Sequence, residues 1–380
     1  MIHWHRTARD PFNQDYAFAT SQNSGADHTP IGFYYNQGGE SITLTRSGTG
    51  RYTAHWPGME NVGSGGGAVM VSIASGFGHC KPELWDDSLA RIRCFDETGA
   101  PFDTVYNVLF WKPREGSEGV AYAFADRPSE ASYQPSSFYS HNPAGGDVMV
   151  SRTGVGQYEV TWAGYGATVQ FAGGLTGHPQ VSAYGTSSDY CNTGSMLVDG
   201  DTIRVHCFDS SGNPVDTRFV ALYVKADRTM RGIAYAWAHL PNIAEYDPLS
   251  AYSANATWEA ITLSRSGFGD YHYLFEDLGR SGLEGLFAHR QISVRGNVPV
   301  MCTRFGMLLN KNESGGVRCG NSSGTLVDTT YDLLLLKPTL TPEPGTAPML
   351  IAGCLLLRAL RRKRDRDGPM QTKGVCVDAE

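Results

Sequence analysis

Apolar and polar residues alternate with a period of two along a stretch that occurs three times in the chain. In residues 215–224 one set of alternate positions holds Val, Thr, Phe, Ala and Tyr, and the other holds Asp, Arg, Val, Leu and Val. This alternation indicates a half-buried β-strand, because successive side chains of a strand point to opposite faces. Residues 108–111 and 333–336, at the matching places, are apolar on both faces. These strands are therefore expected in the middle of a packed sheet.

Each of these strands follows a short turn sequence. The pattern Asp-x-x-Gly begins at Asp96 and Asp209, and Asn321 takes the Asp position in the third copy. At the first position of a type I turn a short polar side chain accepts backbone N–H groups, and Gly at the fourth tolerates a positive φ. Each copy therefore predicts a β-hairpin. The three copies span residues 92–106, 205–219 and 317–331.

Further stretches recur in the same order before each copy. They are a strand of alternating aromatic residues and Ala, a short Tyr-rich strand, a second hairpin with two turn glycines, and a fifth strand. The sequence therefore predicts an all-β chain of three tandem antiparallel repeats of about seven strands each. Units of this length are expected to be β-sandwich-like and to fold as separate beads, with a small barrel as the alternative.

The pattern and composition divide the chain as follows. The predicted parts are an N-terminal tail (1–11), three β repeats (12–113, 119–226 and 232–338), a Pro-rich linker (339–346), a membrane or sorting helix (347–360), and a basic segment with a tail (361–380). The 45 Gly and 19 Pro among 380 residues suit a turn-rich all-β protein.

Charge is distributed unevenly between the body and the C-terminal end. Residues 347–380 hold seven Lys and Arg against four Asp and Glu, which leaves 24 against 34 for the rest of a chain whose net charge is −7. The body is therefore near −10. We expect no nucleic-acid partner, because the phosphate backbone requires a basic surface.

Six of the eight cysteines fall in pairs at matching places of the three repeats. We predict one disulfide per repeat, which would place the body in an oxidising compartment. Closing a loop of roughly 15 residues contributes on the order of 3 kcal/mol to stability. Reduced core thiols are the alternative, and zinc is disfavoured because no Cys-x-x-Cys or His accompanies a pair. The predicted disulfide cysteines are Cys80, Cys94, Cys191, Cys207, Cys302 and Cys319.

The C-terminal end combines three signals in sequence. A Pro-Glu-Pro stretch precedes the apolar residues 347–357, and an Arg-rich cluster follows them. The apolar run is short for a full membrane span, and a buried core helix is the ordinary alternative. The flanking break and basic cluster favour a membrane helix whose basic end stays cytoplasmic, with the repeats on the other side. A simple tail anchor is one version of this arrangement.

Residues 341–364 resemble the PEP-CTERM sorting signal of Gram-negative bacteria. The residues that carry the resemblance are Pro342, Glu343, Pro344, Arg361, Arg362, Lys363 and Arg364. The resemblance implies export, transient anchoring in the inner membrane, processing by an exosortase-like enzyme, and delivery to the cell surface or extracellular polysaccharide matrix. No apolar leader is visible in residues 1–9, so we expect the true start of the reading frame to lie upstream.

Several residues could carry chemistry. Residues 320–324 match Gly-x-Ser-x-Gly, but this pattern coincides with the turn of the third copy and no His follows His289. The recurring acids are suitable calcium ligands, although turn capping and hydrogen bonds at the strand entry explain them better. These acids are Asp96, Asp209, Asp103, Asp216 and Asp328. The recurring Arg46, Arg152 and Arg265 are expected to pair with local carboxylates rather than bind a ligand.

Tryptophans could form a sugar-stacking platform, although most occupy strand positions that alternate into a core. They are Trp56, Trp111, Trp162, Trp237 and Trp258. No cluster of acid, base and nucleophile occurs once only, as a catalytic site would. We therefore predict a non-enzymatic, structural or adhesive protein of the cell envelope with no catalytic residue, metal or cofactor. The alternatives are a carbohydrate-binding module array, with polysaccharide as partner, and a secreted hydrolase.

Overall fold

The structure of the protein is a computed structural model that describes eight stretches of the chain. These are residues 14–63, 65–113, 119–168, 177–196, 200–225, 232–278, 288–309 and 311–338. Below, segment 1 is the described part of residues 14–113, segment 2 of 119–225 and segment 3 of 232–338. The predicted N-terminal tail, most of both predicted inter-repeat linkers, the Pro-rich linker and the C-terminal helix lie outside the described residues.

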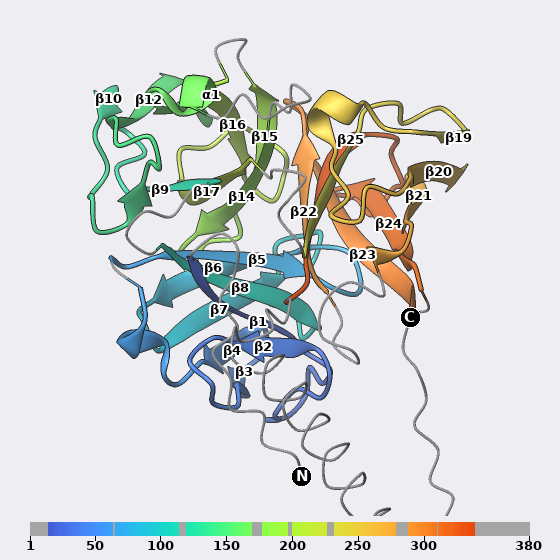
Figure 1. Cartoon of the computed structure of the whole chain (residues 1–380), viewed down its shortest axis with the longest axis horizontal. Coiled ribbons are helices and arrows are strands. Elements are labelled where there is room, and N and C mark those ends of the chain that lie inside the picture. Colours follow the sequence, from blue (N-terminus) through green and yellow to red (C-terminus); the bar gives the residue numbers. More distant parts are fainter. Residues whose placement is uncertain are drawn as a thin grey trace, which may run out of the picture. The chain divides into compact units, whose positions relative to one another are not determined.

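The all-β prediction is confirmed. Strands arranged in several antiparallel sheets make up most of the described chain. Helical structure in the described residues is limited to the four residues of α1 (Tyr165–Thr168) and two 3-10 turns, η1 (Met59–Asn61) and η2 (Ser250–Tyr252). Figure 1 shows the strands of the segments as blue, green and orange groups of arrows.

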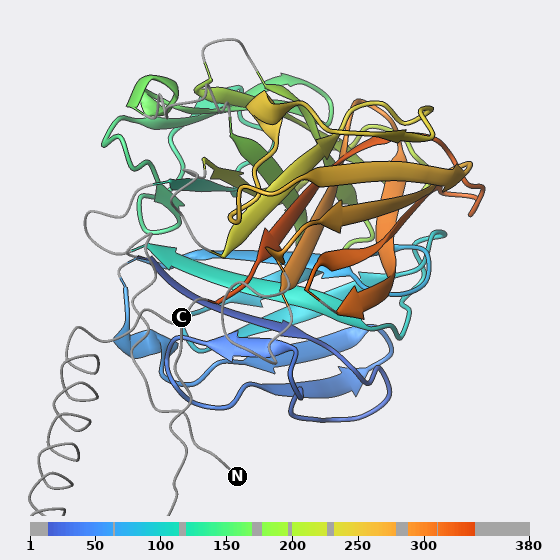
Figure 2. The same cartoon turned by 45° about the vertical axis from the view of Figure 1, so that its right-hand side comes forward.

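Segment 1 consists of two four-stranded antiparallel sheets. The first has the order β2 (Tyr34–Asn36), β1 (Gln14–Thr20), β8 (Tyr106–Pro113), β5 (Ala68–Ile73). The second has the order β3 (Thr43–Gly48), β4 (Arg51–His55), β7 (Leu89–Phe95), β6 (His79–Trp85). In Figure 2, the same drawing after a turn, the blue to teal arrows of this segment lie in stacked layers.

Segment 2 also has two sheets. One is β11 (Ser140–His141), β9 (Val120–Ala125), β17 (Arg218–Val224), β14 (His178–Tyr184). The strands of the other are β10 (Ser132–Tyr133), β12 (Val148–Gly154), β13 (Gln157–Trp162), β16 (Thr202–Phe208) and β15 (Tyr190–Met196).

Segment 3 follows the same plan. One sheet holds β22 (His289–Arg295), β25 (Thr330–Leu336) and β18 (Ile233–Ala238). The other holds β19 (Glu245–Tyr246), β20 (Ile261–Gly267), β21 (Asp270–Phe275), β24 (Glu313–Asn321) and β23 (Val300–Leu309). A single parallel pair, Thr193 with Arg295, links β15 to β22 and so joins a sheet of segment 2 to one of segment 3.

The strands that are apolar on both faces are central and buried, as the sequence predicts. β8 and β25 lie between two neighbours. β17 was expected to be half-buried, but it too lies between two neighbours and is buried on both faces. On β17, Phe219 and Ala221 pack in the core of segment 2, whereas Val220 and Leu222 pack in a core that contains residues of all three segments. The second apolar face is therefore explained by burial between segments.

This shared core overturns the expectation that the repeats fold as separate beads. Residues 14–338 belong to one compact unit. Leu334 and Leu336 of β25 join the core of segment 1, while Leu333 and Leu335 stay in the core of segment 3. A strand with two apolar faces must bury both, and a lone sandwich would leave one of them in water.

Two details of the predicted strands are wrong. The described segments contain eight, nine and eight strands, where about seven per repeat were predicted. The chain between the fifth strand and the repeated hairpin forms an additional strand in each segment, β6, β15 and β23. Each of these strands has a register shift, for example between Pro82 and Leu84, and a bulge breaks the period of two that marks a strand in sequence. The predicted hairpin is also reduced to one bridge, Phe95 with Pro101 in segment 1, because β7 and β8 belong to different sheets.

Candidate functional site

The six predicted cysteines form three disulfides, each between directly opposite residues of neighbouring strands. Cys80 on β6 pairs with Cys94 on β7. The Cα atoms of the three pairs are 4.1, 4.0 and 4.1 Å apart, close to the spacing of a non-hydrogen-bonded antiparallel pair. The other two are Cys191 with Cys207 and Cys302 with Cys319. Each disulfide therefore links a strand that the sequence pattern did not predict, β6, β15 or β23, to its neighbour in the sheet.

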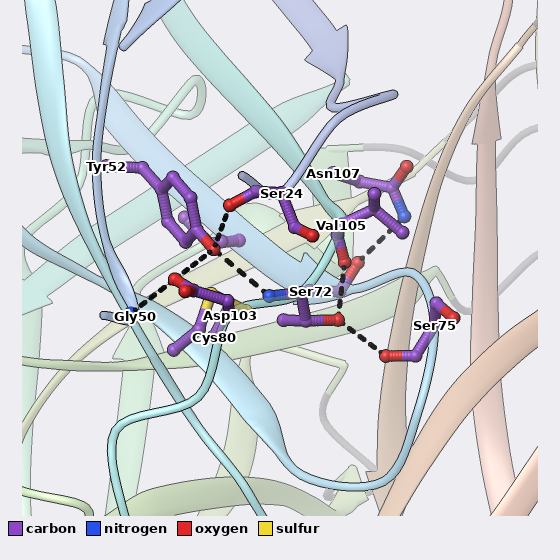
Figure 3. The surroundings of a disulfide bond; sticks show 12 residues. Ser24, Gly50, Tyr52, Ser72, Ser75, Cys80, Asp103, Val105 and Asn107 are labelled. Carbon is purple, nitrogen blue, oxygen red and sulfur yellow. Dashed lines mark hydrogen bonds between the residues drawn. A yellow bond between two sulfur atoms is a disulfide. The ribbon is translucent and has the colours of Figure 1, made fainter. Parts of the chain in front are cut away.

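A carboxylate beside each turn is surrounded by protein donors. The Asp103 carboxylate accepts two hydrogen bonds from the Arg46 guanidinium, at 3.1 and 2.6 Å, one from the Gly50 N–H at 2.9 Å and one from the Tyr52 hydroxyl at 3.0 Å. Figure 3 shows Asp103 between Gly50 and Tyr52, next to the disulfide of Cys80. The Arg46 guanidinium holds the pKa of Asp103 below its usual value.

The same four-residue cluster occurs in each segment. Each recurring arginine pairs with a carboxylate, as predicted, but the expectation of a local partner is wrong, because the partners lie 57, 64 and 63 residues away along the chain. Segment 2 has Arg152, Gly156, Tyr158 and Asp216, and segment 3 has Arg265, Gly269, Tyr271 and Asp328. Because these carboxylates are already occupied by protein donors, they do not form a cation site. Nowhere in the described stretches do three or more His, Cys, Asp or Glu residues group as metal ligands.

The polar residues of the repeated turn cap it, as predicted. Asp96 accepts hydrogen bonds from the N–H groups of Thr98 and Ala100, both at 2.9 Å, and Gly99 has a φ of 87°. Asp209 and Asn321 bond in the same way in the other segments. The Gly-x-Ser-x-Gly pattern at 320–324 is this turn. The next element in the chain is strand β25, so the helix of a nucleophile elbow is missing there.

Most of the tryptophans considered as a sugar-stacking platform are internal, as their strand positions predicted. Trp56, Trp111 and Trp162 are fully buried, so they cannot stack on a ligand. Trp237 is half-buried, with the Arg295 guanidinium 4.5 Å from its ring centroid. Trp258 differs from the others because 64% of its surface is exposed.

At the centre of the described body, three strands from different segments exchange hydrogen bonds through serine hydroxyls. Ser182 on β14 bonds to both backbone groups of Val71 on β5. Ser293 on β22 bonds in the same way to Val181 on β14. The hydroxyl of Ser72, on β5, donates to a backbone carbonyl of β22 at 3.4 Å. Serines at matching positions thus connect each segment to the next.

A cavity of about 60 Å³ lies beside these three serines, Ser72, Ser182 and Ser293. The first cysteine of every disulfide lines it, together with His79, Lys81 and Tyr190. Burial, with the charge of Lys81, lowers the pKa of His79 to about 3, and burial lowers the pKa of Lys81 to about 8. Such a volume holds a few water molecules but no organic substrate. We interpret the cavity as part of a polar core.

The junction of segments 2 and 3 contains a buried ion pair that sequence reasoning missed. Arg295 donates to the Asp332 carboxylate at 2.8 Å, and the Thr193 hydroxyl donates to the same oxygen at 2.9 Å. Burial lowers the pKa of His178 well below its usual value. The imidazole is therefore uncharged where its Nδ1 lies 3.7 Å from the Asp332 carboxylate. An Asp within the apolar run 331–336 was the available sequence signal.

Trp258 lines a surface pocket of about 240 Å³. Asp247 and Glu259 also line it, with Ser250 and Asn255. Both carboxylate side chains are exposed, and neither makes a hydrogen bond or ion pair to another residue of the described stretches. The sequence pointed to Trp258 but gave no indication of the acids beside it.

Comparison with known proteins found no matching protein family, no matching curated protein and no matching solved structure.

No helix in the described stretches is long and apolar enough to cross a membrane. The predicted sorting motif lies outside the described residues, at Pro342, Glu343, Pro344, Arg361, Arg362, Lys363 and Arg364.

Proposed function

We propose that the protein is an exported, non-enzymatic component of the cell envelope with a structural or adhesive role. The observation that carries the proposal is the set of three cross-strand disulfides in one β-rich body. Disulfides form and persist in oxidising compartments and are rare in the cytosol. An adhesive or structural protein outside the cytoplasm also benefits from cross-links that resist unfolding.

The proposed body consists of three tandem β-sandwich-like repeats, at 12–113, 119–226 and 232–338. Three features at matching places support this organisation: the disulfide, the Arg-Asp-Tyr-Gly cluster and the capped turn. In each segment two sheets enclose apolar side chains. Ionisable groups that recur in all segments are engaged in holding the chain together, which favours a structural role over catalysis.

The proposed route to the envelope depends on the C-terminal sequence. Its Pro-Glu-Pro stretch, apolar run and basic cluster support a membrane helix of residues 347–360 and processing by an exosortase-like enzyme. The repeats would then lie on the extracytoplasmic side of the inner membrane before delivery to the surface or matrix. Polysaccharide of that matrix is the proposed partner.

Fractionation with mass measurement tests this proposal. The full reading frame would be expressed in its native cells, and the protein would be recovered from cytoplasm, membrane, cell surface and medium. We expect surface or medium protein whose intact mass shows three disulfides and a chain ending near Pro344. A variant with Arg361, Arg362, Lys363 and Arg364 changed to Gln should accumulate unprocessed. Uncleaved, reduced protein confined to the cytoplasm would contradict the proposal.

Carbohydrate binding is the second candidate function. The observation that favours it is the pocket around the exposed Trp258, since an exposed indole can stack on a sugar ring. Three of the other tryptophans are buried, so this observation favours one site rather than an array of equivalent platforms.

A further inference from the structure

The same asparagine-clamped turn occurs in all three segments. In segment 1 the Asn36 side-chain amide donates to the carbonyls of Glu40 and Pro57, and its oxygen accepts from the Gly38 N–H. The N–H of Gly39 closes the turn on the Asn36 carbonyl at 3.0 Å. Corresponding bonds are made by Asn142 in segment 2 and Asn255 in segment 3.

The residue that closes this turn has a left-handed backbone in every copy. It is Gly39 in segment 1, with a φ of 85°, and Gly145 in segment 2, with a φ of 75°. In segment 3 it is Trp258, with a φ of 69°. Glycine adopts this conformation without steric cost, whereas a bulky residue with a Cβ atom does so only under strain.

The tryptophan lies largely on the surface of the protein. The indole is 64% exposed, and a Cβ atom built at Gly39 or Gly145 meets no heavy atom within 4 Å. The only other non-glycine with positive φ in the described stretches is Asp277, at 55°. Aspartate tolerates this region because its short side chain bonds locally, whereas tryptophan has no such advantage. A strained, exposed aromatic residue therefore suggests a function outside folding.

The surroundings of Trp258 supply hydrogen-bond acceptors next to its ring. Asp247 and Glu259 line the same pocket, and neither side chain has a bonding partner among the described residues. The hydroxyl of Ser250 is also at the pocket. The turn itself is fixed by the Asn255 amide, so the indole and the Glu259 carboxylate are presented from a defined backbone.

We propose that this pocket binds a pyranose ring of a neutral polysaccharide, with one face of the sugar on the Trp258 indole and its hydroxyls donating to Asp247 and Glu259. The apolar C–H face of a pyranose matches an aromatic ring, and carboxylates accept hydrogen bonds from hydroxyl groups. Two unpaired carboxylates repel an acidic sugar. A quaternary-ammonium cage would need further aromatic walls, and Trp258 is the sole aromatic residue among those that line the pocket.

This site extends the proposed adhesive role but does not rest on it. Binding is a property of the purified chain, whether or not the chain is exported. A failure of export would leave the pocket intact, and a failure of sugar binding would leave the disulfide-linked body and its localisation unaffected.

Calorimetric titration of the purified, oxidised full chain tests the proposal, with tryptophan fluorescence as the second readout. The probes are cellopentaose, laminaripentaose, maltopentaose and mannopentaose, with a galacturonic acid pentamer and pentalysine as contrasts. We expect saturable binding of at least one neutral pentamer and none of the acidic one. Trp258→Gly should weaken that binding about tenfold or more, because it removes the ring that anchors the ligand.

The variants separate binding from folding. Trp258→Gly places at this position the residue that segments 1 and 2 already carry, so its melting temperature should be unchanged or higher. Phe268→Ala removes another exposed aromatic side chain, 71% exposed and outside the pocket lining, and should bind as tightly as the parent. Glu259→Gln and Asp247→Asn should each weaken binding severalfold. Absence of binding to all four neutral pentamers, unchanged binding by Trp258→Gly, or salt-sensitive binding of pentalysine alone would each overturn the proposal.

Discussion

The hydroxyl of Ser182 donates to the Val71 carbonyl at 2.9 Å and receives the Val71 N–H at 3.0 Å, so a side chain of segment 2 replaces a neighbouring strand for a residue of segment 1. Both residues are buried. β5 is an edge strand of its sheet, and an edge strand has backbone groups that no strand partner satisfies. The serine meets this need at the centre of the body and makes one segment depend on the next.

Removing this hydroxyl should destabilise the whole body. Ser182→Ala leaves the buried Val71 N–H without its partner, while the Val71 carbonyl keeps a 3.3 Å bond from the Gln291 amide. We expect a cost of about 1–3 kcal/mol in the free energy of unfolding. Urea unfolding followed by circular dichroism measures the change, and Ser211→Ala, in an exposed turn, should have almost no effect. A midpoint equal to that of the parent would show that water readily replaces the serine.

The disulfides should contribute comparably in the three segments. Replacing Cys80 and Cys94 together by Ser opens a loop with a sequence separation of 14 residues, and the expected loss is about 2–4 kcal/mol. Guanidinium unfolding under oxidising conditions measures it. Adding a thiol reductant should reduce the stability of the parent much more than that of a variant lacking all six cysteines. Equal sensitivity of both proteins would mean that the disulfides do not stabilise the fold.

Structural features that depend on residues adjacent in the chain could be predicted from the sequence, whereas those that depend on distant residues could not. Asp96 and its turn were predictable because the bonding residues are adjacent in the chain. β6 was missed because its bulge breaks the alternation of apolar residues. The pairing of Arg46 with a carboxylate was predicted, but the choice of Asp103, 57 residues away, required the fold.

Contacts between segments could not be predicted in the same way. Ser182 is an ordinary polar residue in sequence, and its role depends on a strand 111 residues away. The alternation of residues 215–224 correctly predicted a strand, but it indicated a half-buried one and could not show that another segment covers the second face. Trp258 was recognised in the sequence as a candidate by its residue type alone, whereas its exposure and its left-handed backbone appeared only in the structure.

Acid should destabilise the body well before its carboxylates titrate. Burial lowers the pKa of His79 and His289 to about 3 and that of His178 well below its usual value, whereas an unfolded His titrates near 6.5. Below pH 6.5 the unfolded chain therefore binds protons that the folded chain does not. As a result, the free energy of unfolding decreases as the pH is lowered. Three such groups give a slope of about 4 kcal/mol per pH unit, effective from about pH 6.5 down towards pH 3.

Urea unfolding at pH 7.5, 6.5, 5.5 and 5.0 measures this slope. Stability should be nearly constant between the first two values and should fall steeply over the last three. His289→Gln should decrease the slope by about one third, because one buried imidazole is removed. A parent protein equally stable at pH 7.5 and 5.0 would contradict the assignment of these histidines as neutral.

The tyrosine hydroxyl of each Arg-Asp-Tyr-Gly cluster should stabilise the fold by accepting a hydrogen bond from one buried backbone N–H group. The Tyr52 hydroxyl donates to Asp103 and accepts the Thr104 N–H at 3.0 Å, and Tyr271 does the same for Asp328 and the Thr329 N–H. Removing the hydroxyl leaves the amide unpaired inside the protein, at a cost of about 1–3 kcal/mol.

Tyr52→Phe and Tyr271→Phe should therefore lower the free energy of unfolding by similar amounts. Tyr35→Phe is the matched control, because the Tyr35 hydroxyl bonds to the Gln37 side chain at a partly exposed position and should contribute less than about 0.5 kcal/mol. Urea unfolding at pH 7.5 compares the three variants, since the buried histidines are neutral there. If Tyr52→Phe cost no more than the control, the backbone at Thr104 would have another route to a hydrogen bond, and the cluster would be held by its arginine and aspartate alone.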